Sequence, residues 1–230
     1  MRHADRLATI GQLAAGVAHE LNEPLSNILG FAQLVQKFPE LPSQVFKDVE
    51  RIIRAALHAR EVVTKLMTFA RPKLPVLSEV NLNQLVSDGL YFLASRCAKS
   101  GIELVRQLSP DLPEIVADSG QLHQVLVNLV VNAIQAMPNG GRLTITTKDN
   151  QDGTVSLFVS DTGVGMSDDV KKHIFVPFYT TKPEGTGLGL SVVYGIVTAH
   201  GGSIKVESEP GKGSCFEVIL PVKGNNDDSR

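Results

Sequence analysis

Apolar residues in the first third of the chain repeat at alternating steps of three and four, the spacing that lines one face of a packed helix. Two such runs flank residues 38–43, where Pro39 and Pro42 interrupt a helix and Ser43 can cap a new one. The pattern predicts an antiparallel pair of long helices. Its apolar positions are Leu7, Ile10, Ala14, Val17, Leu21, Ile28 and Val35, with Pro24, Leu25, Phe31 and Ala32 at the intervening steps, then Val45, Val49, Ile52, Ala56, Ala59, Val63, Leu66 and Ala70.

A single helical hairpin leaves half of its apolar stripe in contact with water. Two hairpins that pair as a four-helix bundle bury that stripe, so the pattern predicts a homodimer. The alternative is a monomeric hairpin that folds back onto the rest of the chain.

The remaining sequence mixes helical and alternating segments. Helices are expected near residues 82–100, 119–137 and 188–200, and strands near 102–108, 114–117, 142–148, 154–160, 203–208 and 214–220. The prediction is an α+β chain, with a helical hairpin before an α/β sandwich whose mainly antiparallel mixed sheet has helices on one face. The expected boundaries are 1–72 for the helical domain, 73–79 for a linker, 80–222 for the second domain and 223–230 for a disordered tail.

Composition narrows the class of protein. With 22 basic and 24 acidic residues the formal charge is −2, so there is no net positive field to attract nucleic acid. Cys97 and Cys215 are too few for a disulfide framework and are interpreted as reduced thiols of a cytoplasmic protein. Apolar runs fall short of the ~20 residues that span a bilayer. Because helical periodicity begins near residue 7, an upstream sensor region, with or without a membrane anchor, is expected outside this chain.

The first candidate for chemistry is His19, which is followed by Glu20 inside the first apolar run. A carboxylate that accepts a hydrogen bond from one ring nitrogen leaves the other nitrogen free as a nucleophile. Pro24 cannot donate to the Glu20 carbonyl, so it weakens or bends the helix beside His19. We expect this bend to control access to His19; a Pro24→Ala protein with unchanged reactivity at His19 and an unchanged response to upstream input would contradict this.

Three polar motifs in the second domain predict a nucleotide site. Asn128 and Asn132 share one helical face, and an amide oxygen suits Mg²⁺ that takes its other ligands from phosphates. Asp161 precedes Gly163 and Gly165 and could accept a hydrogen bond from an exocyclic amine. In the stretch Gly185-Thr186-Gly187-Leu188-Gly189 the glycines stop where a helix begins, which predicts an anion site, and the nearby Lys182 could meet a terminal phosphate.

Together these segments resemble the H, N, first-glycine, F and second-glycine boxes of bacterial two-component sensor histidine kinases. The boxes are His19–Pro24, Asn128–Ala133, Asp161–Gly165, Phe175–Phe178 and Gly185–Leu190. The resemblance implies a dimerisation and histidine-phosphotransfer bundle followed by a GHKL-type ATP-binding domain, and a response regulator receiver domain as partner.

The resemblance also implies a role for each matching residue. His19 would accept the phosphoryl group and Glu20 would orient its ring. Asn132 would coordinate Mg²⁺, and Asn128 would support the phosphates of ATP. The remaining roles are adenine binding by Asp161, pocket shape from Gly163 and Gly165, hinges of a mobile lid at Gly185, Gly187 and Gly189, and a hydroxyl near the adenine from Ser214.

Two rival functions remain open at this stage. A hydrolytic ATPase of the same superfold is disfavoured, because relatives of that kind carry a general-base glutamate where this chain has Asn128, and an amide cannot deprotonate water. A nucleotide-binding dimeric scaffold without chemistry is disfavoured by His19 beside Glu20. Glu23 stands where phosphatase-active members have Thr or Asn, so we expect weak phosphatase activity. Glu23-dependent loss of phosphate from a phosphorylated partner would contradict that expectation.

Overall fold

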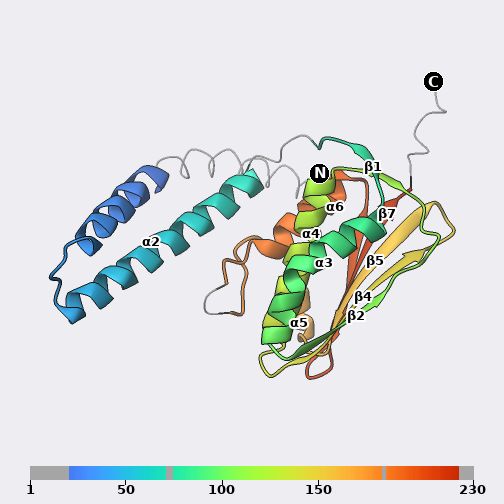
Figure 1. Ribbon diagram of the computed structural model, residues 1–230. Helices are drawn as coiled ribbons and strands as arrows, with labels where there is room; N and C mark the ends of the chain where they lie inside the picture. The colour runs from blue at the N-terminus through green and yellow to red at the C-terminus, as the bar shows by residue number, and fades with distance from the viewer. Residues whose placement is uncertain (1–20, 71–74, 183–184, 223–230) are drawn as a thin grey trace. The chain divides into compact units, whose positions relative to one another are not determined.

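The chain divides into two compact units, Met1–Lys73 and Leu74–Arg230. The computed structural model describes residues 21–70, 75–182 and 185–222 (Figure 1). The candidates His19 and Glu20 and the predicted tail 223–230 therefore lie outside the described residues. So do the predicted start of the first helix and residues 71–74.

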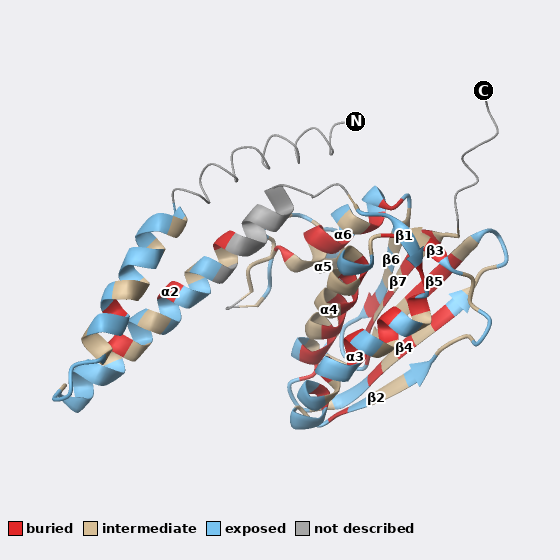
Figure 2. Ribbon diagram, turned by 45° about the horizontal axis from the view of Figure 1, so that its top comes forward, coloured by how far each residue is buried: buried red, intermediate tan, exposed pale blue. Residues whose placement is uncertain are grey.

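The first unit contains the predicted helical hairpin. Residues 21–36 are helical, and after a short connection α2 runs over Ser43–Ala70. Their buried positions are small residues that fall on the predicted stripe, such as Ala32, Val49 and Ala56. Many larger apolar side chains on the same two helices stay exposed, and most of the hairpin surface in Figure 2 is exposed. Phe31 is 70% exposed and Ile52 is 48% exposed.

The second unit is built on a five-stranded sheet with the order β2-β4-β5-β7-β6. Only β2 and β4 pair in parallel; the other neighbours are antiparallel. The predicted α+β fold with a mainly antiparallel mixed sheet is confirmed. The strands are β2 Ile102–Gln107, β4 Gly141–Asp149, β5 Thr154–Asp161, β6 Ser203–Glu209 and β7 Gly213–Pro221.

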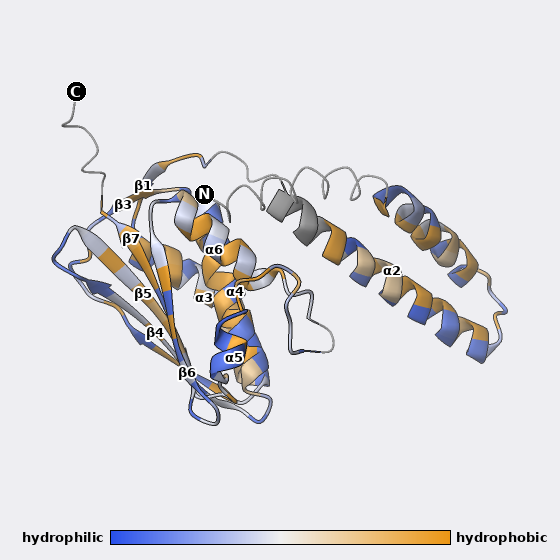
Figure 3. Cartoon of the chain, turned by 180° about the vertical axis from the view of Figure 1, so that it is seen from behind, coloured by the Kyte–Doolittle hydropathy of each residue, from blue (hydrophilic) through white to orange (hydrophobic). Residues whose placement is uncertain are grey.

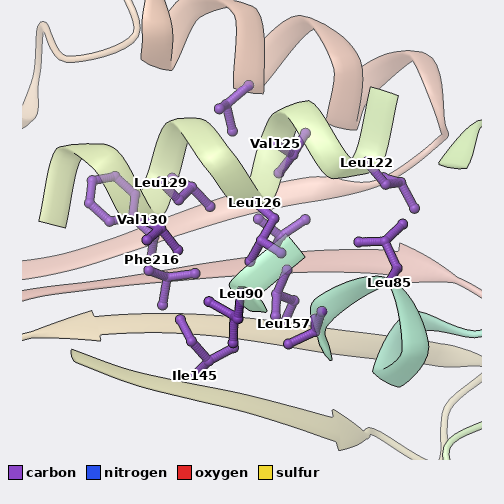
Figure 4. Close-up of a cluster of buried hydrophobic side chains, with 14 of the residues drawn as sticks. Leu85, Leu90, Leu122, Val125, Leu126, Leu129, Val130, Ile145, Leu157 and Phe216 are labelled. Carbon is purple, nitrogen blue, oxygen red and sulfur yellow. The ribbon is translucent and has the colours of Figure 1, made fainter. Parts of the chain in front are cut away.

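Three helices cover one face of this sheet: α3 Leu82–Lys99, α4 Ser119–Ala136 and α6 Gly189–Ala199 (Figures 1 and 2). The core lies between helices and sheet, where apolar side chains from α3 and α4 meet inward positions of the strands (Figure 4). Leu126 and Leu90 are fully buried there, against strand residues such as Ile145 and Leu157.

One expected boundary differs from the structure. Residues 78 and 79 of the expected linker belong to β1 Ser78–Val80, which pairs antiparallel with β3 Ile115–Ala117. This strand escapes pattern analysis because it is three residues long and only Val80 is buried, so no alternation is visible. A one-turn helix, α5 Asp168–Lys171, was also not predicted.

Candidate functional site

The helix α4 presents a polar face beside its buried one. Asp118 caps it by accepting a hydrogen bond from the Gln121 backbone N–H at 3.0 Å. Leu126, Leu129 and Val130 turn toward the core, as Figure 4 shows. The face that carries Asn128 and Asn132 is half-buried. The two amides are therefore held on a rigid helix at the edge of the core.

Asp161 occupies the last inward position of β5. Val155, Leu157 and Val159 precede it at every second residue and are buried, so the carboxylate continues an apolar row. Its Oδ1 accepts a hydrogen bond from the Gly163 N–H at 2.8 Å. Burial raises the pKa of Asp161, while hydrogen bonds from the Gly163 and Ser214 backbones and the Lys182 charge act in the opposite direction. This is a desolvated carboxylate with specific polar partners.

Ser214 lies opposite Asp161 on β7. The Ser208 hydroxyl donates to the Gly213 carbonyl at 2.9 Å and lies 3.0 Å from the Ser214 hydroxyl. Because the Ser208 proton is used in that bond, the Ser214 hydroxyl donates to Ser208 and keeps acceptor capacity. Sequence reasoning did not find Ser208, which has no motif of its own.

The loop after Asp161 passes close to the end of α4. A Cβ on Gly163 would lie 2.4 Å from the Ala136 carbonyl oxygen, so only glycine fits at this crossing. The next residue, Val164, donates its N–H to that same carbonyl at 3.0 Å. Gly165 packs against the turn between β6 and β7, close to the Glu209 carbonyl. The aspartate and the amide-bearing helix are thereby fixed to one another.

Phe178 and Gly187 make a close backbone contact just before the start of α6. Gly187 has φ +66°, and a Cβ there would lie 2.3 Å from the Phe178 backbone. Phe178 donates its N–H to the Gly187 carbonyl at 3.0 Å, which ties together the two ends of the segment from Phe178 to Gly187. Leu188 is fully buried at the N-cap of α6 and provides no side-chain cap. The first N–H groups of α6 therefore have no side-chain acceptor at the N-cap.

Lys182 crosses from this segment to α4. Its Nζ donates to the Asn132 Oδ1 at 3.3 Å and to the Gln135 Oε1 at 2.7 Å. Burial lowers the pKa of the Lys182 ammonium group, and the Asp161 charge acts in the opposite direction. The Asn128 side chain donates to the Gly189 carbonyl at 3.4 Å, and a Cβ on Gly189 would lie 3.9 Å from Asn132 Nδ2.

The described candidates thus form two groups. Asn128, Asn132, Lys182 and Gly189 meet where α4 faces the start of α6, and Asp161, Gly163 and Ser214 lie at the ends of β5 and β7. Gly185 donates its N–H to the Lys182 carbonyl at 3.1 Å, and Thr186 is half-buried. Gln135 was missed, although it lies three residues after Asn132 on the same face, which was a usable signal.

A metal ion fits the donors at the first group. The Asn132 amide oxygen already faces a cation, the Lys182 ammonium group, so it is oriented as a neutral oxygen ligand. Within residues 21–70, 75–182 and 185–222 no cluster of three or more His, Cys, Asp or Glu side chains could hold a metal. This donor set suits Mg²⁺ that is bound mainly by phosphate and water, and no all-protein cage is needed.

Two residues of the predicted acceptor segment fall inside the described part of the first unit. Glu23 and Pro24 are exposed on the helical residues 21–36. Two residues further on, the Ser26 hydroxyl donates to the Asn22 carbonyl at 2.8 Å.

In the described part of the chain, no helix is long and apolar enough to cross a membrane.

Two family models match the chain and together cover most of it. The His Kinase A (phospho-acceptor) domain matches residues 9–74, and the histidine kinase-, DNA gyrase B- and HSP90-like ATPase matches residues 117–224. The chain is 39% identical over 222 residues to the sensor histidine kinase ZraS of Escherichia coli strain K12, covering 96% of this chain and 48% of ZraS. The chain spans about a third to a half of the length of its most similar curated relatives, for example 31% of sporulation kinase E and 52% of sporulation kinase C of Bacillus subtilis.

Solved structures agree with this assignment. Full-length ShkA in complex with AMPPNP superposes with a TM-score of 0.80 at 30% identity, covering 91% of this chain and 45% of ShkA. Histidine kinase ThkA in complex with the response regulator protein TrrA gives a TM-score of 0.69 at 29% identity, covering 95% of this chain and 63% of that one.

The fold and the site define the second unit as an ATP-binding domain of the type shared by histidine kinases, DNA gyrase B and HSP90. With a phospho-acceptor domain before it, the chain has both domains of a two-component histidine kinase core and belongs to the histidine kinase family. The resemblance drawn from the sequence boxes is confirmed.

Proposed function

We propose that the chain is the kinase core of an ATP-dependent, autophosphorylating protein histidine kinase. In the first step the bond between the γ-phosphorus of ATP and its bridging oxygen breaks, a bond forms to a ring nitrogen of His19, and ADP leaves with the electron pair. In the second step the phosphorus–nitrogen bond breaks and an aspartate oxygen of a response regulator takes the phosphoryl group.

One observation carries this proposal. The Asn132 amide lies next to both the Lys182 ammonium group and the start of α6: Lys182 Nζ is 3.3 Å from Asn132 Oδ1, and a Cβ on Gly189 would lie 3.9 Å from Asn132 Nδ2. An amide oxygen, a point charge and uncapped N–H groups are what a terminal phosphate and its counter-ion need. Phosphoryl transfer depends mainly on alignment and charge neutralisation, and these residues supply both.

The residues divide the task between the two ends of the site. Asp161 accepts the exocyclic amine of adenine, and the Ser214 hydroxyl lies beside it. Asn132 and Asn128 hold the phosphate end on the rigid helix α4. Mg²⁺, when bound through Asn132, supplies neutralisation of the charge on the phosphates. Asn128 cannot act as a base toward water, which favours transfer to His19 over hydrolysis.

The first unit supports a homodimer. Phe31 and Ile52 belong to the predicted stripe and are 70% and 48% exposed in the single chain. Figure 3 shows hydrophobic positions along both helices of the hairpin. A second copy that packs these faces together forms a four-helix bundle and removes the apolar surface from water.

The decisive experiment compares the wild type with His19→Gln and Asn132→Ala. With labelled ATP and Mg²⁺, the wild type is expected to acquire acid-labile phosphate. His19→Gln should bind ATP but remain unlabelled, and Asn132→Ala should lose Mg²⁺-dependent ATP binding. Label on His19→Gln would contradict the acceptor assignment, and steady release of free phosphate without protein label would favour the hydrolytic ATPase. Binding without label or hydrolysis in the wild type would favour a scaffold.

A further inference from the structure

The strongest hydrogen bond of Lys182 goes to a residue that none of the nucleotide-site roles includes. Lys182 Nζ lies 2.7 Å from Gln135 Oε1 and 3.3 Å from Asn132 Oδ1. A distance of 2.7 Å is typical of a strong charge-assisted hydrogen bond, whereas 3.3 Å is at the weak end. Gln135 is therefore the principal partner of the ammonium group.

The backbone of Lys182 is held as well. Its N–H donates to the Thr180 hydroxyl at 3.0 Å, and its carbonyl accepts from Gly185 at 3.1 Å. A lysine side chain has four rotatable bonds, so a fixed backbone alone does not place its charge. The Gln135 amide oxygen, on the rigid helix α4, supplies the second fixed point.

Under the proposed function, Asn132 has to give its amide oxygen to a metal ion. The Lys182 ammonium group then loses its 3.3 Å partner, because two cations repel one another at a shared neutral ligand. Gln135 lies three residues further along α4, which corresponds to about 4.5 Å along the helix axis. Its oxygen can keep the ammonium group near the metal without competing for the metal's ligand.

We propose that Gln135 is a positioning residue that holds the Lys182 ammonium group at the phosphate end of the site. This inference rests on the proposed function, since the group that Lys182 meets is the terminal phosphate of ATP. The ammonium group has three donors, so it can bind Gln135 and still donate to phosphate oxygens. Gln135 itself is exposed, and its replacement should leave the fold intact.

The test measures binding of ATP, ADP and adenosine to the full chain by calorimetry with Mg²⁺. We expect Lys182→Met to lower ATP affinity about tenfold or more, and Gln135→Leu to lower it roughly threefold to tenfold, the range for loss of one ordinary hydrogen bond at an exposed side chain. Adenosine affinity should stay unchanged in both. The double variant should match Lys182→Met alone.

The controls separate this inference from the proposed function. Gln84→Leu makes the same replacement at an exposed position of α3 and should leave all three affinities unchanged. Wild-type ATP affinity in Gln135→Leu, with a loss in Lys182→Met, would overturn the role of Gln135 alone. Additive losses in the double variant would overturn it too. Unchanged ATP binding in both Lys182→Met and Asn132→Ala would instead contradict the proposed phosphate site.

Discussion

The two units of this chain differ in how far they bury their apolar side chains. In the second unit Val86, Leu90 and Leu126 are completely buried within one chain, between three helices and a sheet. In the first unit the described buried positions are mainly small, and side chains as large as Phe31 are 70% exposed. The second unit buries its large apolar side chains within one chain, whereas the first unit leaves many of its large apolar side chains exposed. We infer that the nucleotide site can form in a single chain, whereas the bundle that carries the acceptor needs a second copy.

The largest expected effect comes from creating a cavity in the buried core of the second unit. Leu126→Ala removes a fully buried side chain, and we expect it to cost about 2–5 kcal/mol of unfolding free energy. Because the core lies within one chain, that loss should not depend on protein concentration. Urea unfolding followed by circular dichroism at two concentrations measures both quantities.

A surface replacement in the same unit is the control for this loss. Val164 is 61% exposed, and Val164→Ala should change stability by less than about 0.5 kcal/mol. A Leu126→Ala loss that grows on dilution would contradict the division between the two units.

In the first unit, a substitution on the exposed apolar stripe should instead weaken association between two chains. Phe31→Glu puts a charge on the exposed stripe, so the hairpin of one chain should tolerate it while the dimer has to bury it. We expect the dimer to weaken by about 2–4 kcal/mol, or roughly 30- to 1000-fold in its dissociation constant. Analytical ultracentrifugation over a dilution series measures this.

A matched charge nearby tests the specificity of that effect. Gln33 is also exposed on this helix but lies off the apolar stripe, so Gln33→Glu should leave the dimer intact. Adenosine affinity should stay at the wild-type value in both variants, because the site lies in the other unit. Equal dissociation in the two would show that added charge, and not the stripe, decides association.

The same difference in burial explains what the sequence could predict. The α+β fold followed from periodicity, since steps of three and four mark the helices and alternation marks β4, β5 and β7. A three-residue strand such as β1 carries too few positions for a period. The chemistry of Asn132 and Asp161 was visible because polar residues interrupt apolar patterns, and their roles stay predictions. The position of Gln135 on the Asn132 face was a usable signal, but its contact with Lys182 was not visible, because a contact between residues 47 positions apart depends on the tertiary fold.

A smaller effect on stability and ATP affinity is expected at Gly187, where the backbone packs closely against Phe178. Gly187→Ala forces a side chain into a left-handed conformation, at about 1–2 kcal/mol, and places its Cβ against the Phe178 backbone. Lys182 and the start of α6 flank this point, so we expect ATP affinity to fall about tenfold. Thermal unfolding and calorimetry report the two effects.

Another glycine of the same region serves as the matched control. Gly195 lies in α6, and a Cβ there meets nothing within 4 Å, so Gly195→Ala should raise stability by about 0.5–1 kcal/mol. If Gly187→Ala bound ATP as tightly as this control, the crossing at Phe178 would have no part in shaping the site.

The last prediction is a pH dependence that belongs to the second unit alone. Burial raises the pKa of Asp161 above the usual aspartate value, so its ionised form is disfavoured in the folded protein. Asp161 therefore contributes stability to the folded state below the unfolded pKa, and this contribution is lost as pH rises through the folded pKa. Binding of an adenine amine needs the ionised carboxylate, so adenosine affinity should fall when pH is lowered through that same raised pKa.

Adenosine is the right probe because it has no phosphate that titrates in this range. Calorimetry from neutral pH downward should show the affinity falling at a pH above the range of an ordinary aspartate, approaching tenfold per pH unit once the carboxyl is mostly protonated. Asp161→Asn should bind weakly at every pH and show no such slope, and Phe31→Glu should keep the wild-type profile. If the pH profile of adenosine binding changed when Phe31→Glu weakened the dimer, the nucleotide site would depend on the second copy. That result would contradict the inference that the site forms within a single chain.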